Sequence, residues 1–150
     1  MTLELVPIKE TVSENDALIQ DPDFANIVTM TVIFFARVGY SPPWIGYLVR
    51  LDGIFVGSAA FKGRPMKSIV EIAYGTMPAY RQRGIGTKIC RTLVELALQT
   101  DPSVTITART LREENYSTRI LRKNNFVNAG VVKDPEDGKV WEWVYKSGQS

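Results

Sequence analysis

The sequence predicts an α/β fold, in which a mixed β-sheet carries helices on both faces. Its 150 residues are 45% apolar and 23% charged, which is ordinary globular usage and enough to form a core. Segments of strand type and helix type alternate along the whole chain: a strand, two helices, three strands, a helix, a strand, a helix and two strands. With no repeat or linker in view, we expect residues 1–150 to form a single domain.

The first half of the chain is predicted to contain three strands and two helices. Residues 3–8 alternate as a first strand, and residues 11–20 are typical of a helix. Asp23 is expected to cap a second helix that runs to about Val38, with Gly39 as its stop. Strands at 44–51 and 54–61 flank Asp52-Gly53, a strong two-residue hairpin signal.

The helix predicted for residues 23–38 is apolar on more than one face. One side carries Phe24, Ile27, Val28, Thr31, Phe34, Phe35 and Val38, and Met30, Val32 and Ile33 make the other side apolar too. Two interpretations stay open. Either the helix packs against neighbours on both sides, or the surplus face lines a substrate cleft or a dimer contact.

The second half of the chain is predicted to contain four strands, with two helices and one turn between them. Residues 69–77 form a strand that Pro78 ends, and residues 85–100 have the apolar spacing of an amphipathic helix. A β-branched strand at 104–108 is followed by a short basic helix at 115–124. Strands at 126–132 and 139–145 are joined by a turn at 134–138.

Composition excludes several classes of function. A net charge of +2 is too small to indicate a nucleic-acid partner, and no apolar run approaches the roughly 20 residues of a membrane span. The chain has no His and a single Cys90, so a zinc site and any mechanism with an imidazole base are not expected. No secretory signal is visible at the N-terminus. We therefore expect a soluble, cytoplasmic protein without a metal.

The segment from Arg81 to Lys88 has the features of an anion site. It follows a strand, opens a helix, and contains Gly84 and Gly86 between basic residues. A helix start offers unpaired N–H groups and partial positive charge, and glycines let a phosphate approach the backbone. Two nucleotide motifs do not fit: Ile89 stands where the dinucleotide fingerprint needs a third Gly or Ala, and Gly86-Thr87-Lys88 lacks the Gly-Lys-Ser/Thr order of a P-loop.

The same segment resembles the acyl-coenzyme A loop of the GNAT N-acetyltransferases. Arg81, Gly84 and Gly86 match the pattern Gln/Arg-x-x-Gly-x-Gly/Ala of that family. Residues 71–78 look like the strand that leads into the loop, and residues 117–126 are similar to the family's later helix. The resemblance covers nearly the whole chain and is nearest to the branch of the ribosomal-protein N-terminal acetyltransferases. It implies a mostly antiparallel, twisted sheet of 6–7 strands flanked by about four helices.

The resemblance also implies a reaction and a cofactor site. It implies that an acetyl group moves from acetyl-CoA to a primary amine by direct transfer in a ternary complex. The acceptor would be a small-molecule amine or a protein N-terminus, and a homodimer is possible. The alternative is an acyl-CoA-binding protein of the same fold with a different acyl donor or a regulatory role. The residues expected at the coenzyme are Thr76, Met77, Arg81, Gln82, Arg83, Gly84, Ile85, Gly86, Thr87 and Asn115.

Glu71 is the candidate for the base that takes a proton from the amine. On an alternating strand it shares a face with Ala73 and Gly75, whose small size leaves room for a substrate. The alternative is a Glu that only pairs with a Lys or Arg on the sheet. For the thioester oxygen the family uses a backbone N–H of this strand, here that of Met77 or, next, Thr76.

The proton donor for the leaving thiolate is less well defined. Leu121 stands where many family members carry a Tyr, so Tyr116, Ser117 or water would substitute. A thiol with a pKa of about 8.5 leaves fairly easily near neutral pH, so a dedicated acid is not essential. Cys90 is expected to lie in the core, since no His or second Cys could activate it.

Overall fold

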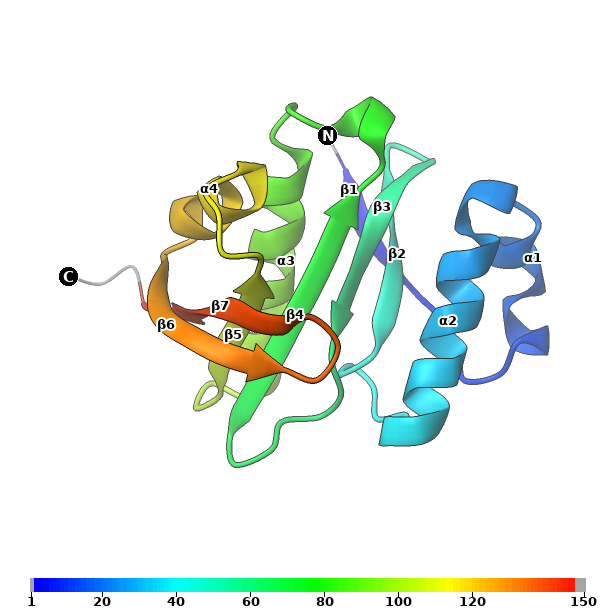
Figure 1. The fold of residues 1–150 in the computed structure, drawn as a ribbon. Coiled ribbons are helices and arrows are strands. Elements are labelled where there is room, and N and C mark those ends of the chain that lie inside the picture. Colours follow the sequence, from blue (N-terminus) through cyan, green and yellow to red (C-terminus); the bar gives the residue numbers. More distant parts are fainter. Residues whose placement is uncertain (1, 148–150) are drawn as a thin grey trace.

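The computed structural model describes residues 2–147 and shows a seven-stranded sheet with helices on both faces (Figure 1). The strands are β1 (Leu3–Pro7), β2 (Gly46–Leu51), β3 (Ile54–Phe61), β4 (Ile69–Thr76), β5 (Thr105–Thr110), β6 (Phe126–Asp134) and β7 (Gly138–Tyr145). Their order is β1-β2-β3-β4-β5-β7-β6, and β4 with β5 is the parallel pair in an otherwise antiparallel sheet. The predicted fold class is confirmed.

Two helical layers cover opposite faces of this sheet. The helices are α1 (Asp16–Ile19), α2 (Pro22–Val38), α3 (Ile85–Thr100) and α4 (Tyr116–Lys123), with short 3₁₀ turns η1 (Ser13–Asn15) and η2 (Pro78–Tyr80). Figure 1 shows α3 and α4 on one side and α1 with α2 on the other. In β4, Ile72 packs in the main core with Ile89 of α3, whereas Ala73 points to the α2 side. Alternate residues of β4 therefore serve two different layers.

The sequence predicted one helix over residues 11–20, and this prediction is wrong in extent. The segment contains only η1 and the four residues of α1. The buried side chain of Asn15 explains the difference. Its Nδ2 donates to the carbonyls of Lys9 and Thr11 at 3.0 and 2.8 Å, and its Oδ1 accepts from the Lys9 N–H at 2.8 Å. Within the predicted segment, a helix would have paired the Thr11 carbonyl with the Asn15 N–H. Here the Asn15 side chain takes that carbonyl, and the Asn15 N–H donates to the Val12 carbonyl instead.

The cap predicted for α2 is also corrected. Asp21, not Asp23, is the N-cap: its carboxylate accepts from the Asp23 N–H at 3.0 Å. Pro22 occupies the first helical turn, where a missing N–H costs nothing. Gly39 ends the helix as predicted, with a φ of 105° and its N–H bonded to the Phe35 carbonyl.

The hairpin between β2 and β3 is confirmed. Asp52 and Gly53 both have positive φ, at 49° and 86°, as the mirror-image hairpin turn requires. The strand predicted from Trp44 begins at Gly46, and the strand predicted at 104–108 runs from Thr105 to Thr110. The structure also lengthens the strand that starts at Phe126 to Asp134, so the last turn is tighter than expected.

Candidate functional site

The glycine loop and the first turn of α3 border a cavity of about 370 Å³, here called the loop cavity. Its lining residues are Gln82, Gly84, Gly86, Thr87, Tyr116, Arg119, Ile120 and Lys123. Gln82 and Gly84 have positive φ, at 63° and 77°, and Gly84 is the N-cap of α3. Backbone that turns in this way aims successive N–H groups at one point, and the helix start adds partial positive charge. The cavity therefore suits an anion.

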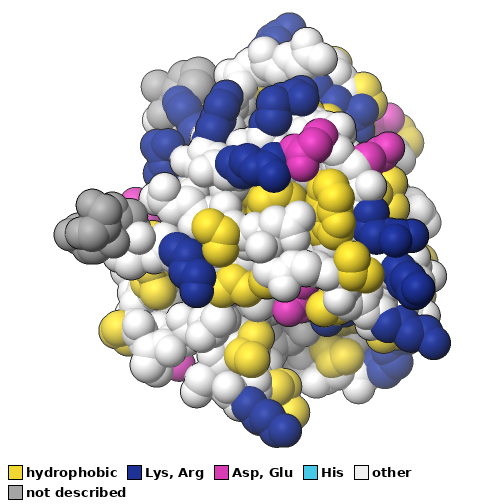
Figure 2. Space-filling view, turned by 60° about the vertical axis from the view of Figure 1, so that its left-hand side comes forward, with side chains coloured by type: hydrophobic (Ala, Val, Ile, Leu, Met, Phe, Trp, Pro, Cys, Tyr) yellow, Lys and Arg dark blue, Asp and Glu magenta, His cyan; other side chains and the backbone are white. Residues whose placement is uncertain are grey.

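Two cations at this cavity were not among the residues proposed from the sequence. Arg119 and Lys123 lie four residues apart on α4 and line the cavity with Tyr116. The signal was present in the sequence, because positions three, four and seven apart share one face of a helix. In Figure 2, Lys and Arg side chains gather on the upper part of the face, at the height of α4. The helix thus adds positive charge beside the loop.

The predicted loop residues fall into two groups. Gln82, Gly84, Gly86 and Thr87 line the cavity, and Ile85 is buried in the core. The two arginines support neighbouring segments. Arg81 Nε donates to the Thr76 carbonyl at 3.2 Å, with its guanidinium 5.4 Å from the Tyr116 ring centre. Arg83 lies 5.8 Å from the ring centre of Tyr80. A direct contact of either arginine with a phosphate stays a prediction.

The parallel strands β4 and β5 separate halfway along their length. Their pairing ends at Ile72 and Ala108, and beyond it a slot of about 200 Å³ opens. The slot is lined by Ile72, Ala73, Tyr74, Ala108, Arg109, Thr110, Leu111, Asn115, Ser117 and Leu121. It lies beside the N-terminus of α4, next to the loop cavity. An elongated ligand could therefore enter the sheet between the two strands.

The register of β4 decides which N–H groups face this slot. Met77 N–H donates to the Val56 carbonyl at 2.8 Å, so the odd-numbered residues of β4 bond toward β3. The proposal that Met77 N–H is the free donor is therefore wrong. Since N–H groups alternate along a strand, those of Tyr74 and Thr76 point toward β5, beyond the last paired residue. Thr76, the second choice from the sequence, has the required direction.

A third hollow, the α2 groove, lies on the other face of β4 and has a volume of about 490 Å³. Its lining residues are Asn26, Ile27, Met30, Thr31, Ile33, Phe34, Phe35, Arg37, Ala60, Phe61, Lys62, Ala73 and Glu136. Each of the two interpretations of α2 holds for part of its surplus side. Met30 and Ile33 line this groove, whereas Val32 packs into the second core cluster with Leu18 and Ile19. Ala73 lines both this groove and the slot. The two spaces therefore adjoin at this residue.

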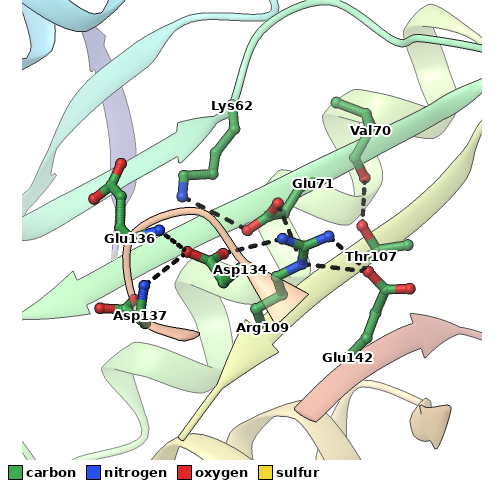
Figure 3. A network of polar contacts seen from close by, with 9 residues as sticks. All are labelled: Lys62, Val70, Glu71, Thr107, Arg109, Asp134, Glu136, Asp137 and Glu142. Carbon is green, nitrogen blue, oxygen red and sulfur yellow. Dashed lines mark hydrogen bonds and ion pairs between the residues drawn. The ribbon is translucent and has the colours of Figure 1, made fainter. Parts of the chain in front are cut away.

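Glu71 belongs to a cluster of charges on the groove side of the sheet, which we call the sheet-face network (Figure 3). Its members are Lys62, Glu71, Arg109, Asp134 and Glu142. Glu71 lies 3.7 Å from Lys62 Nζ and 3.8 Å from Arg109 Nε. Arg109 also donates to Asp134 at 3.0 Å and to Glu142 at 3.3 Å. The ion-paired arrangement considered for Glu71 is present. Of its two partners, Lys62 lines the groove and Arg109 lines the slot, whereas Glu71 itself lines neither space.

The pKa values of two carboxylates in this network, Glu71 and Asp134, shift in opposite directions. Burial raises the pKa of Glu71, and the nearby Lys62 and Arg109 only partly offset it. The N–H of Glu136, the Arg109 guanidinium and the N–H of Asp137 lower the pKa of Asp134 to about 2. Asp134 is therefore charged at neutral pH and anchors the β6–β7 turn. Glu71 is the carboxylate of the pair that protonates more readily.

The start of α4 places its polar residues in two different cavities. Asn115 caps the helix, since its Oδ1 accepts from the N–H groups of Ser117 and Thr118 at 2.9 and 3.2 Å. Asn115 and Ser117 line the slot, whereas Tyr116 turns to the loop cavity. Leu121 is buried and closes the slot where a Tyr is common in the family. Of the two proton donors proposed, only Ser117 borders the slot.

Tyr74 and Cys90 face one another inside the protein, away from the groove. The Tyr74 hydroxyl is buried without a hydrogen-bond partner of good geometry. Burial raises the pKa of both groups, and that of Cys90 reaches about 12. Cys90 is thus a buried thiol in the core, as the sequence predicts, and remains protonated.

Within residues 2–147 there is no group of three or more His, Cys, Asp or Glu side chains that could hold a metal ion. No helix in this part of the chain is long and apolar enough to cross a membrane.

Comparison with solved structures finds the same fold in several acetyltransferases. RimL, a ribosomal L7/L12 α-N-protein acetyltransferase in complex with coenzyme A, is 18% identical with a TM-score of 0.69, over 96% of this chain and 93% of that one. The aminoglycoside acetyltransferase AAC(6′)-Ib in complex with coenzyme A is 21% identical with a TM-score of 0.68, over 97% and 94%. An acetyltransferase of Salmonella typhimurium that modifies the N-terminal serine of L7/L12 is 18% identical with a TM-score of 0.69, over 96% and 94%.

Family comparison gives a direct assignment. No curated protein matches the chain significantly. The model of the acetyltransferase (GNAT) domain matches residues 8–127, which is most of the chain and includes β4, the glycine loop and α4. The chain therefore belongs to the GNAT family of acetyltransferases, enzymes that use acetyl-CoA as the acyl donor.

Proposed function

We propose that this protein transfers an acetyl group from acetyl-CoA directly to a primary amine, with both substrates bound at once. The observation that carries the proposal is the meeting of the slot and the α2 groove at Ala73. The slot is reached from the anion-binding side of the sheet, and the groove from the opposite face. A donor and an acceptor can therefore approach one another through the opening between β4 and β5 without exchanging places.

The donor would occupy the loop cavity and the slot in turn. Its phosphates would lie on the loop N–H groups and near Arg119 and Lys123, since oriented amides and cations both favour anions. Its thioester arm would run past Ser117 into the slot. The N–H groups of Tyr74 and Thr76 point into this space, where they could hold the carbonyl oxygen as negative charge develops.

Glu71 is the proposed base for the amine. Its raised pKa makes it a better proton acceptor than an ordinary Glu, and Lys62 and Arg109 partly offset the effect of burial on that pKa. The demand on this base depends on the acceptor. An alkyl amine with a pKa of about 10.4 must lose a proton first, whereas a peptide α-amine of pKa about 7.7–8.0 is partly neutral already.

Ser117 or water would protonate the leaving thiolate. Ser117 borders the slot, and Leu121 stands at the position where many relatives carry a Tyr. A protein N-terminus and a small amine both remain possible acceptors, because the compared structures include an enzyme for each. A cytoplasmic location, expected from the sequence, stays a prediction, and the oligomeric state stays open.

The test compares two carboxylates of one network. Glu71→Gln should bind acetyl-CoA as tightly as the wild type and lose turnover by about 10²-fold or more, the usual contribution of a general base. Glu142→Gln removes a charge from the same Arg109 and serves as the control: kcat should stay close to wild type, and a change confined to KM for the amine would reflect the lost negative charge of the network. Equal activity in both variants would show that Glu71 is only an ion-pair partner. Failure of the wild type to bind acetyl-CoA would refute the proposed function itself.

A further inference from the structure

We infer that the acceptor is an amine with a single positive charge and an apolar body, and that the body lies along α2. The inference rests on the proposed function, because it concerns the second substrate of that reaction. Its basis is the composition of the α2 groove together with the charge balance of the sheet-face network. Neither the family nor the fold determines this choice, since the compared structures act on very different acceptors.

The wall formed by α2 is apolar although it faces solvent. Met30 is 56% exposed and Ile33 is 55% exposed, and both line the groove with Phe34. The opposite wall and floor add Phe61, Ala60 and Ala73. Exposed apolar side chains grouped in one concave surface mark a binding site more often than they occur without function. A ligand with a hydrocarbon or aromatic group would cover this wall.

Charges around the groove leave room for one ammonium group. Arg37, Lys62 and Glu136 line the groove, and Lys62 continues into the sheet-face network. The groove residues and the network together hold three cations and four carboxylates, so one negative charge is uncompensated. An acceptor with one ammonium group balances this set. An acceptor with several ammonium groups would find no further unpaired carboxylate, and its extra charges would be repelled by Arg37 and Lys62.

The position of the ammonium group follows from the same residues. Glu71 is the network carboxylate whose pKa burial raises. It lies two residues before Ala73 on the same face of β4, and its partners Lys62 and Arg109 line the groove and the slot. A charged amine held there would relieve its desolvation. The remaining length of the groove, toward Met30 and Ile33, is left for the apolar body.

Turnover with four amines tests the inference. The probes are 2-phenylethylamine and hexylamine as apolar monoamines, ethanolamine as a polar monoamine, and spermidine as a polycation. Release of free coenzyme A would be measured at one ionic strength. We expect kcat/KM for the two apolar amines to exceed that for ethanolamine and spermidine by about tenfold or more, as burial of an apolar group provides. Spermidine as the best substrate would overturn the inference and leave the acetyltransferase activity intact.

A binding measurement does not depend on turnover. The methyl resonance of Met30, assigned with a Met30→Leu variant, should shift on addition of 2-phenylethylamine and not of spermidine. A Met30 methyl resonance that does not shift on addition of 2-phenylethylamine would overturn the inference, even if the enzyme is active.

A pair of substitutions tests whether the apolar body of the amine binds at the α2 wall. Met30→Glu should lower kcat/KM for 2-phenylethylamine by about tenfold and leave acetyl-CoA affinity unchanged, since it places a charge on the apolar wall. Ile54→Glu is the matched control: Ile54 is also 56% exposed and lies at the β2–β3 hairpin, outside the groove. If both variants keep wild-type kcat/KM, the α2 wall is not the acceptor site.

Discussion

A β-carbon on Gly86 would lie 2.6 Å from the Cδ1 atom of Ile120, so the start of α3 and the middle of α4 touch through a glycine. Both residues line the loop cavity, which makes this contact part of the proposed coenzyme site. The glycine of the family motif therefore has two roles in this chain. It leaves the loop open to a ligand, and it lets α4 with Arg119 and Lys123 approach the loop.

Gly86→Ala should weaken acetyl-CoA binding more than it affects stability. The atom that must move is the end of a flexible side chain, and Ala favours a helix, so unfolding should change by less than about 1 kcal/mol. The displaced Ile120 side chain narrows the cavity, and the Kd measured by calorimetry should rise several-fold. Ile120→Val removes the clashing methyl, so the double variant should recover. Wild-type affinity in Gly86→Ala alone would contradict the packing described.

Arg119→Gln and Lys123→Gln should each raise the Kd for acetyl-CoA by about three- to tenfold. Both side chains are exposed and reach the loop cavity, so their attraction for phosphate is moderate and is screened by salt. The salt dependence of the Kd should fall in each variant. Lys139→Gln, an equally exposed charge on β7, is the control and should bind as the wild type. Unchanged binding in both α4 variants would place the phosphates elsewhere.

Gly57→Ala should destabilise the protein by about 2–3 kcal/mol. A β-carbon there would lie 2.2 Å from the carbonyl oxygen of Gly75 and 3.2 Å from Thr76 Cα, so backbone atoms of β4 would have to move. Urea unfolding measures the loss, with Ser58→Ala in the same strand as the control. A midpoint equal to that of the wild type would mean that the β3–β4 register is different.

Asp134→Asn should cost stability at neutral pH and not in strong acid. The pKa of Asp134 falls from its usual 3.8 to about 2, so its charge stabilises the fold above pH 4 and this contribution disappears as the pH falls toward 2. We expect a loss of about 1–2 kcal/mol at pH 7, after allowing for solvent screening. Asn keeps an oxygen for the N–H groups of Glu136 and Asp137, so the turn itself is retained.

Chemical denaturation of both proteins from pH 7 to pH 2.5 would test this. The two stability curves should converge in acid. A difference that stays constant over the whole range would mean that the pKa of Asp134 is not lowered in the folded protein.

Local sequence signals predicted most of the fold. The Asp52-Gly53 hairpin, the helix stop at Gly39 and the helix after the glycine loop depend on neighbouring residues, and all three are confirmed. The segment at residues 11–20 was misjudged because the side chain of Asn15 pairs with backbone carbonyls of the preceding loop, which no periodic pattern shows.

The sequence by itself determined the family and the position of the glycine loop, since phosphate binding at a helix start needs only adjacent residues. Tertiary structure decided which groups reach the reaction. Strand register turned the N–H of Met77 toward Val56 and those of Tyr74 and Thr76 toward the slot. It also gathered Lys62, Glu71, Arg109, Asp134 and Glu142, which four strands and a loop contribute from distant parts of the chain. Contacts of this kind depend on sheet order and register, and neither is encoded in any short stretch of residues.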